Sequence, residues 1–176
     1  MDTGPQYPGN RYVAIADYSQ NSRQKRFYLL DLRTGEVSQE KVSHGGGQSG
    51  RGRALGDPNH DGMIDRCSAR PGTNMSAPGF TQVGDFYMNL NQSRFRGWPL
   101  IQRNPPRNGV RLYSLADGVD RHDPVFNRGL VLHEARYNLP GNAVMGRSHG
   151  CPAFVPGRGK PVMDKLRNGG LLYTYA

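Results

Sequence analysis

A cysteine in a glycine- and proline-bounded turn, with a histidine upstream, is the clearest chemical feature of this chain. Cys151 stands between Gly150 and Pro152, a setting that predicts a turn with an accessible sulfur. His133 lies 18 residues earlier, at the end of the apolar run Leu130–Leu132. A neighbouring imidazolium lowers the pKa of a thiol and keeps the sulfur ionised, so the pair predicts a thiolate nucleophile.

Each of these two residues has an ordinary structural explanation when it is taken alone. A single cysteine is most often a buried structural thiol, and a single histidine is most often a satisfied core or surface side chain. Together they meet the minimum requirement for covalent catalysis, a nucleophile with a base to take its proton. The turn adds backbone N–H groups, which can stabilise the oxyanion of a tetrahedral intermediate at an acyl carbon.

The spacing of the pair resembles that of a known family. His133, followed after fourteen residues by Ser148-His149-Gly150-Cys151, is similar to the signature of the YkuD-type L,D-transpeptidases. The flanks resemble the murein L,D-transpeptidase catalytic-domain subfamily, the second YkuD-like group, including its G-R-S-x-G-C-P-A loop at residues 146–153. Other resembling segments are 25–28, 42–50, 76–80, 128–137 and 169–175, so the resemblance spans about residues 11–175.

The resemblance implies a cysteine-dependent L,D-transpeptidase that acts on peptidoglycan stem peptides. Cys151 would attack the carbonyl between the L-centre of a diamino acid and the terminal D-Ala, and His133 would hold the thiolate and protonate the leaving amine. The loop residues Ser148, His149 and Gly150 belong to the implied catalytic set, with the N–H groups of His149, Gly150 and Cys151 as the oxyanion hole. An acceptor amine would resolve the acyl-enzyme by 3–3 cross-linking or D-amino-acid exchange.

Three further residues are expected at the substrate. Arg147 would either steer a carboxylate of the stem peptide or serve a structural role. His44 would either line the cleft or simply end a strand, and Tyr137 is the third residue expected at the substrate. No metal or organic cofactor is implied. A carbapenem-type β-lactam should acylate Cys151, because its strained carbonyl mimics the scissile amide.

The sequence departs from the family pattern at two places. Most YkuD-type enzymes have Arg or Asn two positions after the cysteine, where this chain has Ala153; the subfamily pattern itself has C-P-A. His133 is followed by Glu134-Ala135 instead of Gly-Thr or Gly-Ala. Glu134 should point away from His133 on a strand, so we do not expect it to be catalytic.

Other functions on the same sequence stay open. An L,D-carboxypeptidase would use water to cleave off the terminal D-Ala. An antibacterial effector would damage a rival's cell wall, and a non-catalytic module would only bind the wall. We do not expect a signal peptide within the first residues of this sequence, since residues 1–5 are neither basic nor followed by an apolar segment. The family resemblance nevertheless implies the periplasm or the extracytoplasmic cell envelope.

Two weaker patterns suggest metals, and a second cysteine needs an explanation. Residues 57–65 imitate the front of an EF-hand loop, but Ser68 takes the twelfth place instead of Glu, which favours a plain turn over calcium. A zinc site from His44, His133, His149 and Cys151 fits no common ligand spacing. Cys67 lies beside Arg66 and Arg70, which predicts a lowered pKa for its thiol, and we interpret this residue as incidental.

Composition sets the fold class. The 24 Gly and 13 Pro among 176 residues argue against a helical bundle and favour a β-rich domain with many turns. No apolar run is long enough to span a membrane, so no membrane insertion is expected. The net charge of +9, carried mainly by Arg, predicts an anionic partner; without a nucleic-acid motif we expect the wall polymer and no nucleic acid.

The elements that would position the site follow from pattern. We expect a single domain over 1–176 with a long Gly/Arg-rich loop at 45–78, mainly β, as a YkuD-like sandwich or flattened barrel with a short C-terminal helix. Pro161 and the pair Gly169-Gly170 bound that helix at about 160–167. The expected strands are 12–18, 26–32, 36–44, 79–90, 95–102, 109–115, 128–137 and 171–175.

Overall fold

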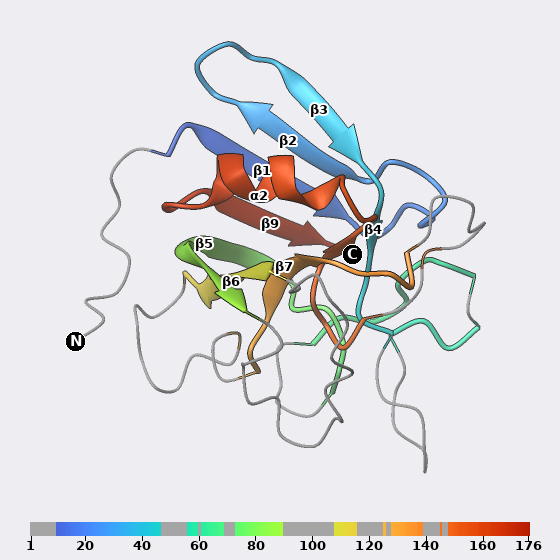
Figure 1. Ribbon diagram of the computed structural model, residues 1–176. Helices are drawn as coiled ribbons and strands as arrows, with labels where there is room; N and C mark the ends of the chain where they lie inside the picture. The colour runs from blue at the N-terminus through green and yellow to red at the C-terminus, as the bar shows by residue number, and fades with distance from the viewer. Residues whose placement is uncertain are drawn as a thin grey trace.

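Nine strands in the described part of the chain form one curved sheet (Figure 1). The computed structural model describes residues 10–46, 56–59, 61–68, 73–89, 108–115, 125, 128–138, 145 and 148–176. The strands are β1 Tyr12–Asp17, β2 Phe27–Asp31, β3 Val37–Glu40, β4 Val42–Ser43, β5 Gly79–Asn89, β6 Asn108–Ser114, β7 Val131–Glu134, β8 Ala153–Phe154 and β9 Leu171–Tyr175. The helix α2, Gly159–Leu166, lies between β8 and β9 in the chain.

The strand order explains why the sheet curves. It runs β3-β2-β1-β9-β5-β6-β7-β8-β4, with β1–β9 and β7–β8 parallel and the other pairs antiparallel. The strands β3 and β4 lie at opposite ends of this order, yet only Lys41 separates them in the chain. The two ends of the sheet must therefore approach each other, which gives a nearly closed, barrel-like sheet. The predicted mainly-β flattened barrel with a C-terminal helix is confirmed.

Alternating side chains fill the inside of the curved sheet. In β1 and β2 the buried positions are every second residue, Ala14 and Ala16 facing Phe27 and Leu29. Helix α2 packs against β1 and β7 and adds an apolar face to this core (Figure 1). The buried side chains of that face are Val162, Met163 and Leu166.

One expectation about elements needs correction. The predicted strand 36–44 is interrupted at Lys41, because β3 pairs with β2 whereas β4 pairs with β8. In the described part of the expected loop 45–78, backbone hydrogen bonds fix the chain to the turn after β1 and to itself. Examples are Ile64 N–H to the Tyr18 carbonyl, 3.2 Å, and Ser68 N–H to the Ser76 carbonyl, 2.9 Å. The expected strand 95–102 lies outside the described residues.

Among the described residues, no helix has the length and apolarity to cross a membrane.

Candidate active site

Two short parallel strands bring His133 next to the Cys151 turn. In the β7–β8 pair His133 stands opposite Ala153, and the His133 N–H donates to the Pro152 carbonyl at 3.3 Å. The sulfur of Cys151 is hydrogen-bonded to the backbone of Val131, two residues before His133 on β7. The 18-residue separation in sequence thus becomes adjacency across a strand pair.

The imidazole of His133 has a defined tautomer in this setting. Its Nδ1 lies 3.0 Å from the Glu134 carbonyl oxygen. A carbonyl oxygen can only accept, so Nδ1 carries the proton and donates it. In the neutral ring the basic lone pair is then on Nε2, the arrangement needed by a base that takes a proton through Nε2.

The side chain of Glu134 bonds to helix α2 and not to the His133 imidazole. Its Oε1 accepts hydrogen bonds from the N–H groups of Gly159 and Lys160, both at 2.8 Å. The N-cap residue Arg158 makes no side-chain capping hydrogen bond, so Glu134 supplies the missing acceptor at the N-terminus of α2. Its carboxylate is therefore committed to α2, as expected for a side chain opposite in direction to His133.

Gly150 is required by its conformation and by its neighbours. Its φ of 112° lies in a region that L side chains rarely adopt. An added Cβ would overlap the Arg128 guanidinium and would lie 2.7 Å from the Met75 carbonyl oxygen. The turn before Cys151 can therefore pack closely against Met75 and Arg128 only because residue 150 is glycine.

Residues 44–46 support the Cys151 turn from the other side. Ser148 N–H donates to the His44 carbonyl at 2.8 Å, and Gly46 N–H donates to the Ser148 carbonyl at 3.2 Å. A Cβ on Gly45 would lie 2.6 Å from the Gly150 Cα, so these two backbones touch. Close packing against the turn therefore requires glycine at position 45.

The side chain of Ser148 contacts a predicted oxyanion donor. Its Oγ accepts the Gly150 N–H at 3.2 Å. In this structure that N–H is satisfied within its own turn. A substrate oxyanion would have to share or replace this bond.

His44 lies in a buried network of charged side chains and has no exposed surface. Arg26 has only donors, so its NH2 group donates to His44 Nδ1 at 2.7 Å, and His44 Nε2–H donates to Asp57 Oδ2 at 3.2 Å. Burial lowers the pKa of Arg26 to about 10, while Tyr18 and Asp57 oppose that shift. The expected contact of His44 with substrate would therefore be indirect, through the backbone bond to Ser148.

Cys151 is buried, and burial raises the pKa of its thiol. The hydrogen bond with Val131 and the charges of Arg128 and Arg111 act in the opposite direction. The predicted lowering of this pKa is therefore wrong: desolvation outweighs the nearby cations, and the pKa of the thiol is raised.

Cys67 also departs from its prediction. Burial raises the pKa of its thiol to about 11, whereas the neighbouring arginines in the sequence predicted a lowered value. The side chain packs against the hydrophobic core. Sequence neighbours were misleading here because the local solvent exposure, and not the charge of adjacent residues, dominates the shift.

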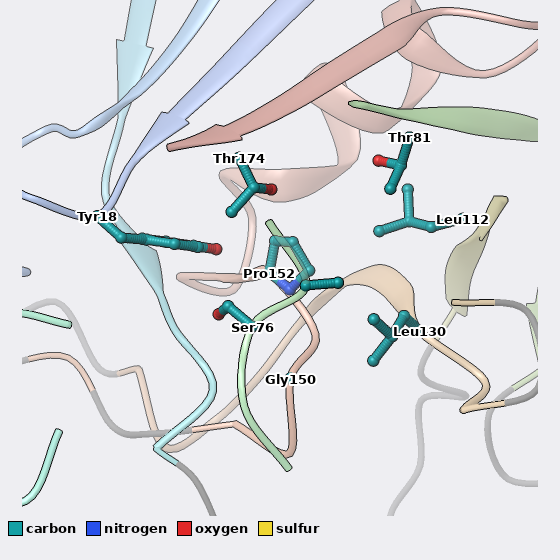
Figure 2. Close-up of a pocket in the computed structure, with 9 residues that line it drawn as sticks. Tyr18, Ser76, Thr81, Leu112, Leu130, Gly150, Pro152 and Thr174 are labelled. Carbon is teal, nitrogen blue, oxygen red and sulfur yellow. The ribbon is translucent and has the colours of Figure 1, made fainter. Parts of the chain in front are cut away.

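A small cavity lies behind the Cys151 turn (Figure 2). Pro152 and Gly150 form part of its wall, with Tyr18 and Ser76 on one side and Leu112 and Leu130 on the other. Its volume is about 10 Å³, close to the minimum that one water molecule needs. The cavity is too small to hold a peptide.

The remaining candidates are distributed as follows. Tyr137 is 39% exposed in the turn after β7, four residues beyond His133. The side chain of His149 is exposed, next to Cys151. Arg147 lies outside the described residues. Among the described residues, no three His, Cys, Asp or Glu side chains gather closely enough to hold a metal ion.

The expected calcium-like loop is a set of local turns in its described part. Asp61 Oδ1 accepts the Met63 N–H at 2.8 Å, and Asp57 Oδ2 accepts the Gly62 N–H at 3.3 Å in addition to its contact with His44.

The sequence matches the L,D-transpeptidase catalytic domain family over residues 4–96 and 101–175. The chain belongs to this family. The strand with His133 and the turn with Cys151 both fall within the matched segments, which confirms the resemblance inferred from the sequence.

Solved structures share the fold. An L,D-transpeptidase from Mycobacterium smegmatis superposes with a TM-score of 0.54 at 16% identity, over 96% of this chain and 60% of that chain. The transpeptidase LdtMt1 in complex with imipenem superposes with a TM-score of 0.52 at 16% identity, over 94% of this chain and 59% of that chain. This chain therefore spans about three fifths of the length of either structure. A search of curated proteins found no match.

Proposed function

We propose that this chain is a cysteine-dependent L,D-transpeptidase that acts on peptidoglycan stem peptides through an acyl-enzyme, in the extracytoplasmic cell envelope. The observation that carries the proposal is the β7–β8 pairing, which places His133 beside Pro152 and Ala153, directly after Cys151. Family membership supplies the reaction class, and this pairing supplies a nucleophile and a base.

The first half-reaction starts from a neutral thiol. As the Cys151 sulfur attacks the carbonyl carbon, its proton passes to Nε2 of His133, whose other nitrogen is held as Nδ1–H by the Glu134 carbonyl. The C–N bond to the terminal D-amino acid then breaks, and His133 returns the proton to the leaving amine. The product is a thioester between Cys151 and the donor stem.

The second half-reaction decides between the competing outcomes. An amine of a second stem, or a free D-amino acid, attacks the thioester, gives its proton to His133 and releases the thiol. If water attacks instead, the result is a trimmed stem, the L,D-carboxypeptidase outcome. The cation Arg147 and the half-exposed Tyr137 are the proposed contacts of the stem.

Imipenem provides a direct test of the acyl-enzyme. LdtMt1, a structural relative, was solved in complex with this compound. Incubation of the full chain with imipenem should give one covalent adduct, which peptide mass spectrometry should assign to Cys151. Cys67→Ala should keep the adduct, and Cys151→Ala should lose it while retaining the circular dichroism spectrum of the fold.

Incubation with sacculi separates the outcomes of turnover. New 3–3 dimers in the muropeptide profile would support transpeptidation. Loss of terminal D-Ala without new dimers would show that the reaction is carboxypeptidation instead. An unchanged profile together with no imipenem adduct would leave a wall-binding module and contradict the enzyme. Cys151→Ala, run in parallel, should reduce turnover by at least about 10³-fold.

A further inference from the structure

Arg128 is held beside the Cys151 turn by three backbone carbonyls from distant parts of the chain. One guanidinium nitrogen, NH1, donates to the Ser68 carbonyl at 2.7 Å. The other, NH2, donates to the Met75 carbonyl and, at 3.5 Å, to the His149 carbonyl. A half-buried arginine with three carbonyl partners has a defined position, because each bond restricts the planar guanidinium further.

The long contact to His149 favours one orientation of a peptide group in the candidate site. In a planar trans peptide the C=O and the following N–H point in opposite directions. When Arg128 holds the His149 carbonyl on its own side, the Gly150 N–H must therefore point away from Arg128. That N–H faces Ser148 Oγ and is one of the donors predicted for the oxyanion hole.

The same guanidinium brings a positive charge to the turn. It lies against Gly150, where an added Cβ would overlap NH2, and Cys151 is the next residue. A cation at this place favours the thiolate over the thiol, since opposite charges stabilise each other strongly in a partly desolvated site. Burial lowers the pKa of Arg128, and a thiolate at Cys151, once formed, would raise it again.

We propose that Arg128 is a positioning residue of the active site: it orients the His149–Gly150 peptide and lowers the cost of forming the Cys151 thiolate. The inference rests on the proposed function, because both effects matter only if Cys151 attacks an acyl carbon. A purely structural Arg128 would connect residues 68 and 75 to the Cys151 turn by hydrogen bonds without affecting the ionisation of the sulfur.

Three substitutions separate charge from geometry. Arg128→Met removes the charge at similar length, Arg128→Lys keeps the charge without the planar fork, and Arg158→Met is the matched control. Arg158 is a 58% exposed arginine paired with Glu40. Within the described ranges, the other titratable groups placed near Cys151 are Arg111 on β6, His133 on β7 and Tyr18 after β1, and all stay unchanged in these variants.

The first measurement is the pH dependence of Cys151 alkylation by iodoacetamide, in a Cys67→Ala background. Arg128→Met should move the titration to higher pH and slow alkylation at pH 8 by about 3–10-fold, because the rate follows the thiolate fraction. Arg128→Lys and Arg158→Met should titrate close to the parent. A titration in Arg128→Met equal to that of Arg158→Met would overturn the charge role.

The second measurement is the rate of imipenem acylation. Both Arg128→Met and Arg128→Lys should be slower than the parent by about tenfold or more, because neither side chain can hold the carbonyls of Met75 and His149 together. Acylation of Arg128→Lys at the parental rate would overturn the orienting role. If Arg128→Met does not fold, Arg128→Lys alone still decides this point.

Failure of the proposed function gives a different pattern. A parent protein that forms no imipenem adduct contradicts the transpeptidase, whereas the alkylation titration needs no substrate and still tests the influence of Arg128 on the sulfur.

Discussion

The reactivity of Cys151 depends on opposing influences at one atom. Burial raises the pKa of the thiol, and a hydrogen bond from β7 together with the charges of Arg128 and Arg111 lowers it. A nucleophile that starts neutral is protected from alkylation and oxidation until a base takes its proton. His133, with its proton fixed on Nδ1, is suited to be that base.

Both thiols should therefore titrate above the ordinary pKa of a thiol. With Cys67→Ala the remaining Cys151 should react with iodoacetamide at a rate that still rises above the ordinary thiol pKa of about 8.5, because burial disfavours the thiolate. With Cys151→Ala the remaining Cys67 should give a midpoint near 11. Stopped-time alkylation read by mass spectrometry measures both. A Cys151 rate that is already constant by pH 7 would contradict this and restore a thiolate–imidazolium pair.

Gly150 should be intolerant of any side chain. We expect Gly150→Ala to destabilise the fold by at least about 3 kcal/mol, since it combines an unfavourable φ with overlap against Met75 and Arg128. Gly157→Ala is the matched control: its φ of 82° is also positive, but nothing lies within 4 Å of its Cβ position. That control should cost only about 1–2 kcal/mol. Urea unfolding of both variants measures the difference, and equal losses would mean that packing at the turn is not tight.

At the scale of elements, Glu134 links the strand that carries His133 to helix α2. Glu134→Ala should destabilise the protein by about 0.5–2 kcal/mol, because the N–H groups of Gly159 and Lys160 lose their acceptor. Imipenem acylation should stay within about twofold of the parent, since the carboxylate points away from the sulfur. The control Glu40→Ala removes only the surface pair with Arg158 and should cost less than about 1 kcal/mol. A large fall in acylation without a fall in stability would instead make Glu134 catalytic.

Elements bounded by local signals were predictable from the sequence. The helix bounded by Pro161 and Gly169 occurs at Gly159–Leu166, and the strands expected at 12–18 and 79–90 occur at Tyr12–Asp17 and Gly79–Asn89. The two-residue strand β8 was not identified, and β4 was predicted only as part of one strand 36–44, because strands this short have too little alternation to show where they begin and end. The parallel pairing of β1 with β9 joins opposite ends of the chain and is decided by packing, which local patterns do not contain.

In the candidate site, too, only the residues whose types and spacing carry a local signal were predictable from the sequence. Cys151 and His133 stand out because their residue types and spacing are themselves chemical signals. Arg128 does not, since its three carbonyl partners are 60, 53 and 21 residues away and contribute backbone atoms that any residue type has. Burial at Cys151 and Cys67 was equally invisible, and it reversed the expected direction of both thiol pKa shifts.

At the scale of the molecule, the candidate site lies at the β7-β8-β4 end of the sheet order. The turn with Cys151 leads into β8, which pairs with β4, and β4 leads into residues 44–46 that support the turn. Because these contacts join distant parts of the chain, the candidate site forms only when β4, β7 and β8 have assembled. Their assembly is further stabilised by Asn138, whose buried Nδ2 donates to the Ala153 carbonyl at 2.8 Å and to Ser43 Oγ at 3.3 Å.

The net charge of +9 belongs to the whole molecule and predicts how it meets an anionic wall polymer. We expect binding of Cys151→Ala to purified sacculi to weaken steadily from 0.05 to 0.5 M NaCl (about tenfold or more), because the screening length falls from about 10 Å at 0.1 M to about 3 Å at 1 M. This variant is used so that no acyl-enzyme forms and the wall is not remodelled during the assay.

Pelleting with sacculi measures the bound fraction, and sucrose at matched osmolarity controls for effects other than screening. Since exposed arginines attract carboxylates through solvent, loss of binding should follow ionic strength and not the identity of the salt. Binding that is equally tight across this range would mean that the wall is held by uncharged contacts, and the basic surface would then need another anionic partner.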